Sequence, residues 1–139
     1  MKTEVIVDHL GGLKFEAKAR KHSIMCDQPV ENGGLDEGMT PPEFLLASLG
    51  TCAGYYAVQY LRTRNLIGEG LRVRTTAGKA SAPARLADFR IEVEYPGRLD
   101  ERHREGMLRA IRTCLIHNTL LNAPRIEVEI VEMTAPMAA

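Results

Sequence analysis

The sequence predicts an α+β fold in a single domain that spans residues 1–139. Three observations support this prediction. Short segments of alternating apolar and charged residues occupy the first 26 positions, a long apolar segment follows at residues 40–65, and two more alternating segments precede a second helical pattern and a final strand. Consecutive strands with separately placed helices are typical of α+β proteins and not of a doubly wound parallel sheet.

The first part of the chain is predicted to form antiparallel strands. Residues 3–9 alternate weakly, Gly11-Gly12 is typical of a hairpin turn, and residues 13–20 place apolar side chains opposite Lys and Glu. A third short strand is expected at residues 22–26. The glycine-rich and acidic segment 31–38 is then expected to form a functional loop, because it is longer than an ordinary connection.

The segment from Thr40 to Asn65 is predicted to be the central helix. Thr40 and Glu43 have the spacing of a capping box, and Pro41 occupies the first helical position, where its missing N–H costs nothing. Residues 44–58 are apolar or small on nearly every side, so this helix is expected to be buried all round.

The second half repeats the pattern of strands followed by a helix. Residues 71–77 and 89–95 alternate as two antiparallel strands, and Asp100 is expected to cap a helix whose apolar stripe includes Cys114. Residues 125–132 alternate again and are predicted to form the last strand.

The composition excludes several functional classes. Eighteen basic and eighteen acidic residues leave no net charge that would attract nucleic acid or anionic lipid. No apolar run is long and uninterrupted enough for a membrane span, and the first residues do not resemble a signal peptide. Three cysteines argue against a secreted disulfide framework, so a cytoplasmic protein is expected.

Two cysteines lie on the apolar faces of the two predicted helices. Cys52 and Cys114 are 62 positions apart, so only tertiary packing could bring them together. One interpretation is that both are small core residues, since free cysteine is among the most buried residue types. The other is a peroxidatic and resolving pair, which would need a cation near the attacking thiol. The candidate cations are residues of the early strands, namely Lys14, Arg20, Lys21 and His22.

Two other interpretations of the cysteines are weaker. Cys114 and His117 have a C-x-x-H spacing, but no second half of a zinc site follows, and nothing supplies the third group of a Cys–His hydrolase. Cys26 stands alone after a strand and is interpreted as structural.

Two segments of the chain resemble the OsmC/Ohr superfamily of osmotically induced and organic hydroperoxide resistance proteins. The first runs from the glycine pair at Gly33 through Pro41 and Glu43 to Cys52, and the second begins at Cys114 and continues through residues 115–120. The resemblance implies antiparallel sheets wrapped around two central helices in an intertwined homodimer, with sites at the subunit interface. It also implies hydroperoxide reduction by Cys52 as the peroxidatic and Cys114 as the resolving cysteine. Re-reduction by a dithiol such as a lipoylated protein is implied as well, with neither a metal nor an organic cofactor.

The sequence departs from the Ohr branch at two places. Pro42 stands where that branch has its activating glutamate, which makes Glu43 the nearest carboxylate, and Leu13-Lys14 follows the early glycine pair where that branch has an arginine. Glu43 and Arg20 are therefore the candidates for adjusting the reactivity of the Cys52 thiol. Two functions follow as hypotheses: an organic hydroperoxide reductase, or a dimer that keeps the fold and binds a small apolar or thiol ligand with little peroxidase activity.

Overall fold

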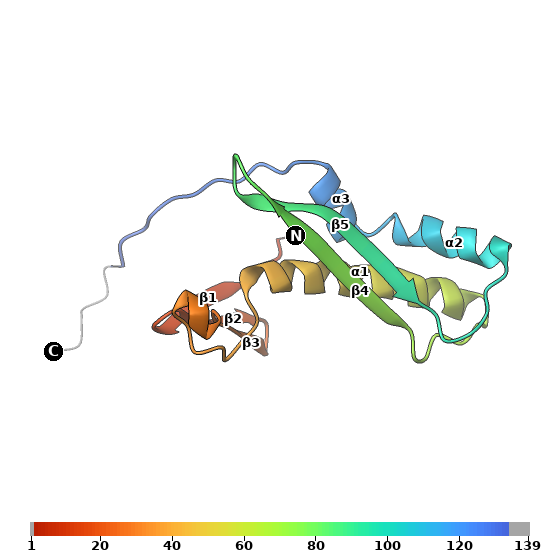
Figure 1. Ribbon diagram of the computed structural model, residues 1–139, viewed down its shortest axis with the longest axis horizontal. Coiled ribbons are helices and arrows are strands. Elements are labelled where there is room, and N and C mark those ends of the chain that lie inside the picture. Colours follow the sequence, from red (N-terminus) through yellow and green to blue (C-terminus); the bar gives the residue numbers. More distant parts are fainter. Residues whose placement is uncertain (1, 134–139) are drawn as a thin grey trace.

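The computed structural model describes residues 2–133 and contains a small sheet, a long helix, a hairpin and two further helices (Figure 1). The elements are β1 (Ile6–Gly11), β2 (Lys14–Ala19), β3 (His22–Cys26), the 3₁₀ turn η1 (Val30–Asn32), α1 (Pro41–Thr63), β4 (Arg72–Ala80), β5 (Arg85–Glu94), α2 (Glu101–Ile111) and α3 (Leu115–Leu121). Both sheets are antiparallel, so the predicted α+β class is confirmed. Within the described residues, no helix has the length and apolar content needed to cross a bilayer.

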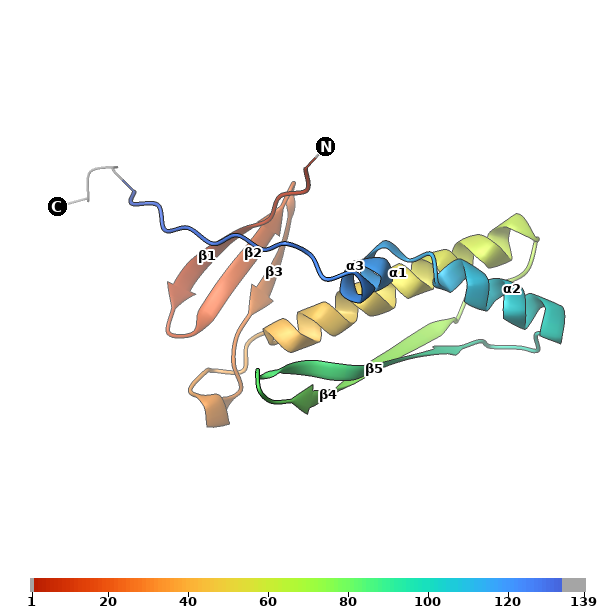
Figure 2. The ribbon, with the colours of Figure 1, turned by 90° about the horizontal axis from the view of Figure 1, so that it is seen from above.

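The N-terminal sheet has the order β1-β2-β3 and stands apart from the helices (Figure 2). Gly11 and Gly12 form the predicted turn with φ of +108° and +54°, a region that glycine adopts without strain. The pairs Val7–Ala17 and Ala17–Ile24 place apolar side chains on one face. Val7 and Ile24 are nevertheless more than half exposed, because no extensive contact joins this sheet to the rest of the chain.

Helix α1 is the centre of the remaining structure and contacts α2, α3 and the β4–β5 hairpin. The predicted capping box of Thr40 and Glu43 is present at its start. The buried core consists of Ala53, Ala57, Tyr60 and Leu61 of α1 with Met107 and Ile111 of α2.

The hairpin approaches α1 closely where the helix carries glycine. A Cβ added at Gly50 would lie 3.2 Å from the methyl group of Thr75, and the Thr75 hydroxyl donates a hydrogen bond of 2.9 Å to the Leu46 carbonyl. The expectation that α1 is buried all round is wrong for the single chain. Tyr55 is 57% exposed, and Thr51 and Gln59 also face solvent.

The second helical segment differs from the prediction because the chain forms two helices instead of one. Asp100 caps α2 by accepting a hydrogen bond of 2.8 Å from the His103 N–H, as predicted. The helix then ends, and Cys114 adopts φ −55° and ψ 128°, which is outside the helical region. The Thr113 hydroxyl donates to the Ala110 carbonyl at 2.6 Å, a local bond that competes with helix continuation.

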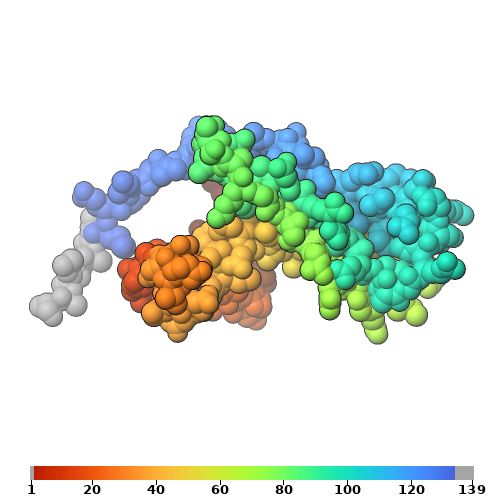
Figure 3. All heavy atoms as spheres, viewed as in Figure 1, coloured from red at the N-terminus to blue at the C-terminus, as the bar shows by residue number. Residues whose placement is uncertain are grey.

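The predicted strand at residues 125–132 is not formed in the single chain. This segment is extended and reaches beyond the body of the molecule (Figure 3), but it pairs with no strand. Ile126, Val128 and Ile130 are 79%, 88% and 94% exposed. The alternating pattern is that of a strand, but a strand needs a neighbour for its backbone groups, and none lies beside it within residues 2–133.

Candidate functional site

Packing of α1 against α2 and α3 brings Cys52 and Cys114 together. Cys52 is half-buried in the middle of α1, and Cys114 is fully buried at the junction of α2 and α3. The two side chains are within hydrogen-bonding reach of each other, and both are free thiols. The structure therefore joins two groups that are 62 positions apart in the sequence.

The surroundings of Cys114 favour its protonated form. Burial raises the pKa of the Cys114 thiol, and the neighbouring Cys52 sulfur raises it further. The backbone N–H groups of His117 and Ile116 act in the opposite direction but do not reverse the shift, with His117 donating to Sγ at 3.4 Å. Cys114 is thus a neutral thiol at neutral pH that can donate a hydrogen bond to its neighbour.

Glu43 makes its hydrogen bonds at the start of α1 and not at the thiols. Its Oε1 accepts from both the backbone N–H and the hydroxyl of Thr40, each at 2.9 Å, and these bonds lower the pKa of Glu43. Glu43 precedes Cys52 by nine residues, which corresponds to about 13.5 Å along a helix axis. In one chain, Glu43 therefore caps a helix and does not touch the Cys52 sulfur.

The basic candidates lie on the N-terminal sheet and have no polar contact with Cys52 in the same chain. Arg20 occupies the turn between β2 and β3 with φ +56° and is exposed. Lys14 is engaged elsewhere, in an ion pair with Glu37 of the glycine-rich loop. None of these residues supplies, within one chain, a cation that would stabilise a Cys52 thiolate.

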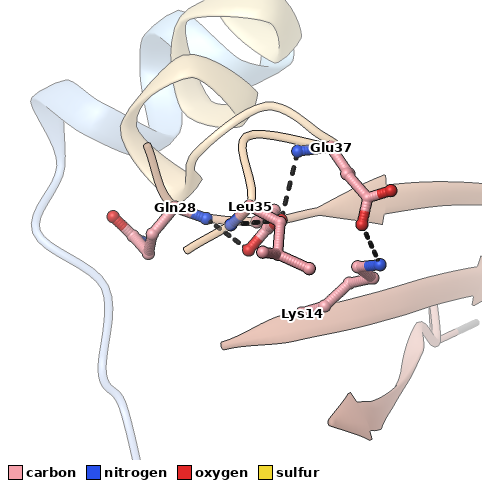
Figure 4. Close-up of polar contacts among 5 residues, drawn as sticks. Lys14, Gln28, Leu35 and Glu37 are labelled. Atoms are coloured by element: carbon pink, nitrogen blue, oxygen red, sulfur yellow. Dashed lines mark hydrogen bonds and ion pairs between the residues drawn. The ribbon is translucent and has the colours of Figure 1, made fainter. Parts of the chain in front are cut away.

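The glycine-rich loop is held by a buried carboxylate that the sequence analysis missed (Figure 4). Asp27 is 1% exposed and accepts backbone hydrogen bonds from Gln28 at 2.8 Å, Leu35 at 3.2 Å and Glu37 at 3.1 Å. Gly34 packs so tightly that an added Cβ would lie 2.0 Å from the Gln28 carbonyl oxygen. Only glycine fits there, which explains one residue of the Gly33-Gly34 motif.

The charge state of Asp27 follows from these contacts. Burial disfavours its ionised form, but the hydrogen bonds from Gln28, Glu37 and Leu35 and the charge of Lys14 outweigh it, so the pKa of Asp27 is held below its usual range. An aspartate immediately before a Gly-rich loop was the only sequence signal of this arrangement.

A large apolar cavity of about 860 Å³ lies between β5 and helices α2 and α3, next to the thiols. Leu49, one helical turn before Cys52, contributes to its wall, as do Ile111 and His117 on either side of Cys114. The alternation of residues 89–95 indicated an inward face on this strand, but the sequence did not show that the face borders an open cavity. Residues 2–133 contain no cluster of three or more His, Cys, Asp or Glu side chains that could hold a metal ion.

Comparison with known proteins identifies the family. The family model described as OsmC-like protein matches residues 34–129, which include both cysteines and the glycine-rich loop. The chain belongs to the OsmC-like protein family. No curated protein sequence matches this chain.

Solved structures of OsmC-like proteins have the same fold as this chain. A protein from Psychrobacter arcticus 273-4, named for osmotic stress induction and a detoxification response, is 24% identical with a TM-score of 0.78, covering 86% of this chain and 88% of that one. An OsmC-like protein from Mycoplasma pneumoniae is 18% identical with a TM-score of 0.69, covering 88% and 89%. An organic hydroperoxide resistance protein from Elizabethkingia anophelis is 17% identical with a TM-score of 0.59, covering 88% and 91%. These similarities establish the fold.

Proposed function

We propose that this OsmC-like protein is a thiol peroxidase that reduces organic hydroperoxides through Cys52 and Cys114. The observation that carries the proposal is the side-by-side position of the two free thiols, whose neighbours Leu49, Ile111 and His117 line an apolar cavity. Family membership and the hydroperoxide resistance protein among the structural neighbours support the same class of chemistry.

The proposed reaction has three balanced steps. The Cys52 thiol attacks the terminal oxygen of the hydroperoxide, so that an S–O bond forms, the O–O bond breaks and an alcohol leaves with Cys52 as a sulfenic acid. The Cys114 thiol then attacks the Cys52 sulfur, which forms a disulfide and releases water. A dithiol, such as a lipoylated protein, finally reduces the disulfide and is itself oxidised to a cyclic disulfide.

The environments of the two thiols support the proposed roles. Cys52 is half-buried, whereas Cys114 is fully enclosed and its raised pKa keeps it protonated. A protonated neighbour can stabilise a thiolate by donating a hydrogen bond to it. These environments support Cys52 as the attacking thiol and Cys114 as the resolving thiol.

The groups that activate Cys52 are proposed to come from a second copy of the chain. The N-terminal sheet and residues 122–133 leave apolar side chains exposed and have no extensive contact with other elements within residues 2–133, which favours a homodimer. In such a dimer, Arg20 or another basic residue of one subunit's N-terminal sheet would approach Cys52 of the other. Glu43, at the start of α1, would interact with that cation and so adjust the reactivity of the Cys52 thiol.

The alternative is a dimer that binds a small apolar or thiol ligand and turns over peroxide poorly. The cavity, and the absence within residues 2–133 of a polar contact between Cys52 and the basic residues of the N-terminal sheet, favour this second function. Stopped-flow oxidation of the wild type by cumene hydroperoxide, with dihydrolipoamide as reductant, separates the two. A rate far above that of a free thiol, abolished in Cys52→Ser, supports the peroxidase; a rate equal to that of a free thiol contradicts it.

A further inference from the structure

Cys114 has a second place in the fold besides its position next to Cys52, because its sulfur caps helix α3. The Sγ atom accepts a hydrogen bond of 3.4 Å from the His117 N–H, which is the bond that an N-cap side chain makes to the first turn of a helix. Sulfur is a weak acceptor, so this cap is weaker than one made by serine or aspartate. The thiol pair and the start of α3 therefore share one atom.

Helix α3 has little else to hold it in place. None of its seven residues is fully buried, and Leu115 and Leu121, at its two ends, are each 70% exposed. Its main packing contact is with α1. A helix of this length is not stable by intrinsic propensity. The order of its first turn therefore depends in part on the bond from His117 to the Cys114 sulfur.

A disulfide between Cys52 and Cys114 would compete with this cap. A covalent S–S bond requires the two sulfurs to approach more closely than hydrogen-bonded sulfurs do. Cys52 is fixed in the middle of α1, where the next residue, Ala53, is fully buried. Cys114 lies between the end of α2 and the lightly packed α3, so the movement falls to Cys114. Its side chain then turns away from the His117 N–H and toward Cys52.

We propose that formation of the Cys52–Cys114 disulfide releases the first turn of α3, and that this opening lets a dithiol reach the Cys114 sulfur. Cys114 is fully buried in the reduced chain, and a thiolate must reach a disulfide sulfur in order to reduce it. The thiolate of the dithiol attacks the Cys114 sulfur, the S–S bond breaks, and Cys52 leaves as a thiolate that takes up a proton. The second thiol of the dithiol then attacks the mixed disulfide and closes a cyclic disulfide, while its proton passes to Cys114, which caps α3 again.

This inference rests on the disulfide of the proposed peroxidase, but it is tested without a peroxide. Diamide couples two thiols to a disulfide and takes up their two hydrogens, so it makes the bond whether or not Cys52 reacts with hydroperoxides. A Cys52 that is inert toward cumene hydroperoxide therefore contradicts the peroxidase alone. If peptide mass spectrometry finds no Cys52–Cys114 bond after diamide treatment, this inference is overturned.

Hydrogen exchange at the amides of residues 116–118 measures the first turn of α3. We expect exchange to be about two- to fivefold faster in the diamide-oxidised chain than in the reduced chain, which is the factor that loss of a weak N-cap gives, with α2 as the internal control. Cys114→Ala should show the faster exchange without oxidation, whereas Cys114→Ser keeps a hydroxyl cap and should show the slow exchange. Equal exchange in the oxidised and reduced wild type, or in the two variants, would overturn the release of α3.

Variants of Leu115 test the route of the reductant. Proline suits the first position of a helix, and it favours in the preceding residue the extended backbone that Cys114 already has, with φ −55° and ψ 128°. Dihydrolipoamide should therefore reduce the diamide-formed disulfide of Leu115→Pro about two- to fivefold more slowly than that of the wild type. Leu115→Gly loosens the same position and should be reduced faster. Equal reduction rates in the wild type and both variants would contradict a route through α3.

Discussion

Asp27 shows how one buried side chain can organise a whole loop. Its two oxygens accept three backbone N–H groups from residues 28, 35 and 37, which have no other partner in regular secondary structure. A buried carboxylate satisfied in this way is stabilising as long as it stays ionised. The loop that leads from β3 to the start of α1 therefore depends on a charge at residue 27.

We predict an acid-sensitive loop that depends on Asp27. Because the pKa of Asp27 is lowered in the folded state, its stabilisation is present above the unfolded value of about 3.9 and is lost as pH falls through the lower folded value. Hydrogen exchange of the Leu35 and Glu37 amides should show this loss in the wild type, and exchange at pH 6 should be faster in Asp27→Asn. Asp36→Asn, in the same loop but without these bonds, is the control. Unchanged exchange in Asp27→Asn would contradict the assignment.

Gly106 allows Tyr60 to lie directly against α2. An added Cβ would lie 2.3 Å from the Tyr60 oxygen, which itself contacts His103 Nδ1 at 3.1 Å. We predict that Gly106→Ala lowers the free energy of unfolding by about 1–3 kcal/mol, the usual cost of overpacking. Gly54→Ala is the control, since its nearest contact is an ordinary 3.5 Å and alanine favours a helix. Urea unfolding measures both, and equal effects would show that the Tyr60 contact is unimportant.

At the scale of elements, the start of α1 tests whether Glu43 acts only as a cap. Thr40→Ala removes the hydroxyl that donates to Glu43, while the backbone N–H of residue 40 remains, and should lower the free energy of unfolding by about 1 kcal/mol. If the cap is the only role of Glu43, Thr40→Ala and Glu43→Gln should change the oxidation rate of Cys52 equally little. A large rate loss in Glu43→Gln alone would show that Glu43 reaches the site of a second subunit.

Elements with a local signal were predictable from the sequence. The turn at Gly11-Gly12, the capping box at Thr40 and the alternating strand at residues 89–95 each depend on neighbours in the chain, and each is present. The break before α3 was missed because Cys114 continues the apolar stripe of α2 while its backbone leaves the helix. Periodicity reports which side a residue faces and cannot report where the backbone changes direction.

Contacts between distant elements could be predicted only in part. The proximity of Cys52 and Cys114 was expected from the family resemblance, whereas spacing alone left it open. Asp27 and the position of the cavity between β5, α2 and α3 were missed, because both arise from tertiary packing. The segment at residues 125–132 is the opposite case: its sequence alternates as a strand does, but no strand pairs with it among the residues that the structure describes.

For the whole molecule, we predict a homodimer that buries the exposed apolar segments. Multi-angle light scattering should give twice the monomer mass for the wild type. Val128→Asp should shift the mass toward the monomer, because a charge would replace an apolar side chain at the interface, whereas Glu127→Gln on the opposite face should not. A wild type that is monomeric at all concentrations would contradict both the dimer and the supply of Arg20 from a second subunit.

The most direct test of the thiol pair is a count of free thiols after one equivalent of cumene hydroperoxide. The proposed function predicts that the wild type loses two of its three thiols, that Cys52→Ser loses none, and that Cys114→Ser stops at a sulfenic acid on Cys52. Three unreacted thiols in the wild type would contradict the peroxidase and leave the cavity as the functional site of this OsmC-like protein.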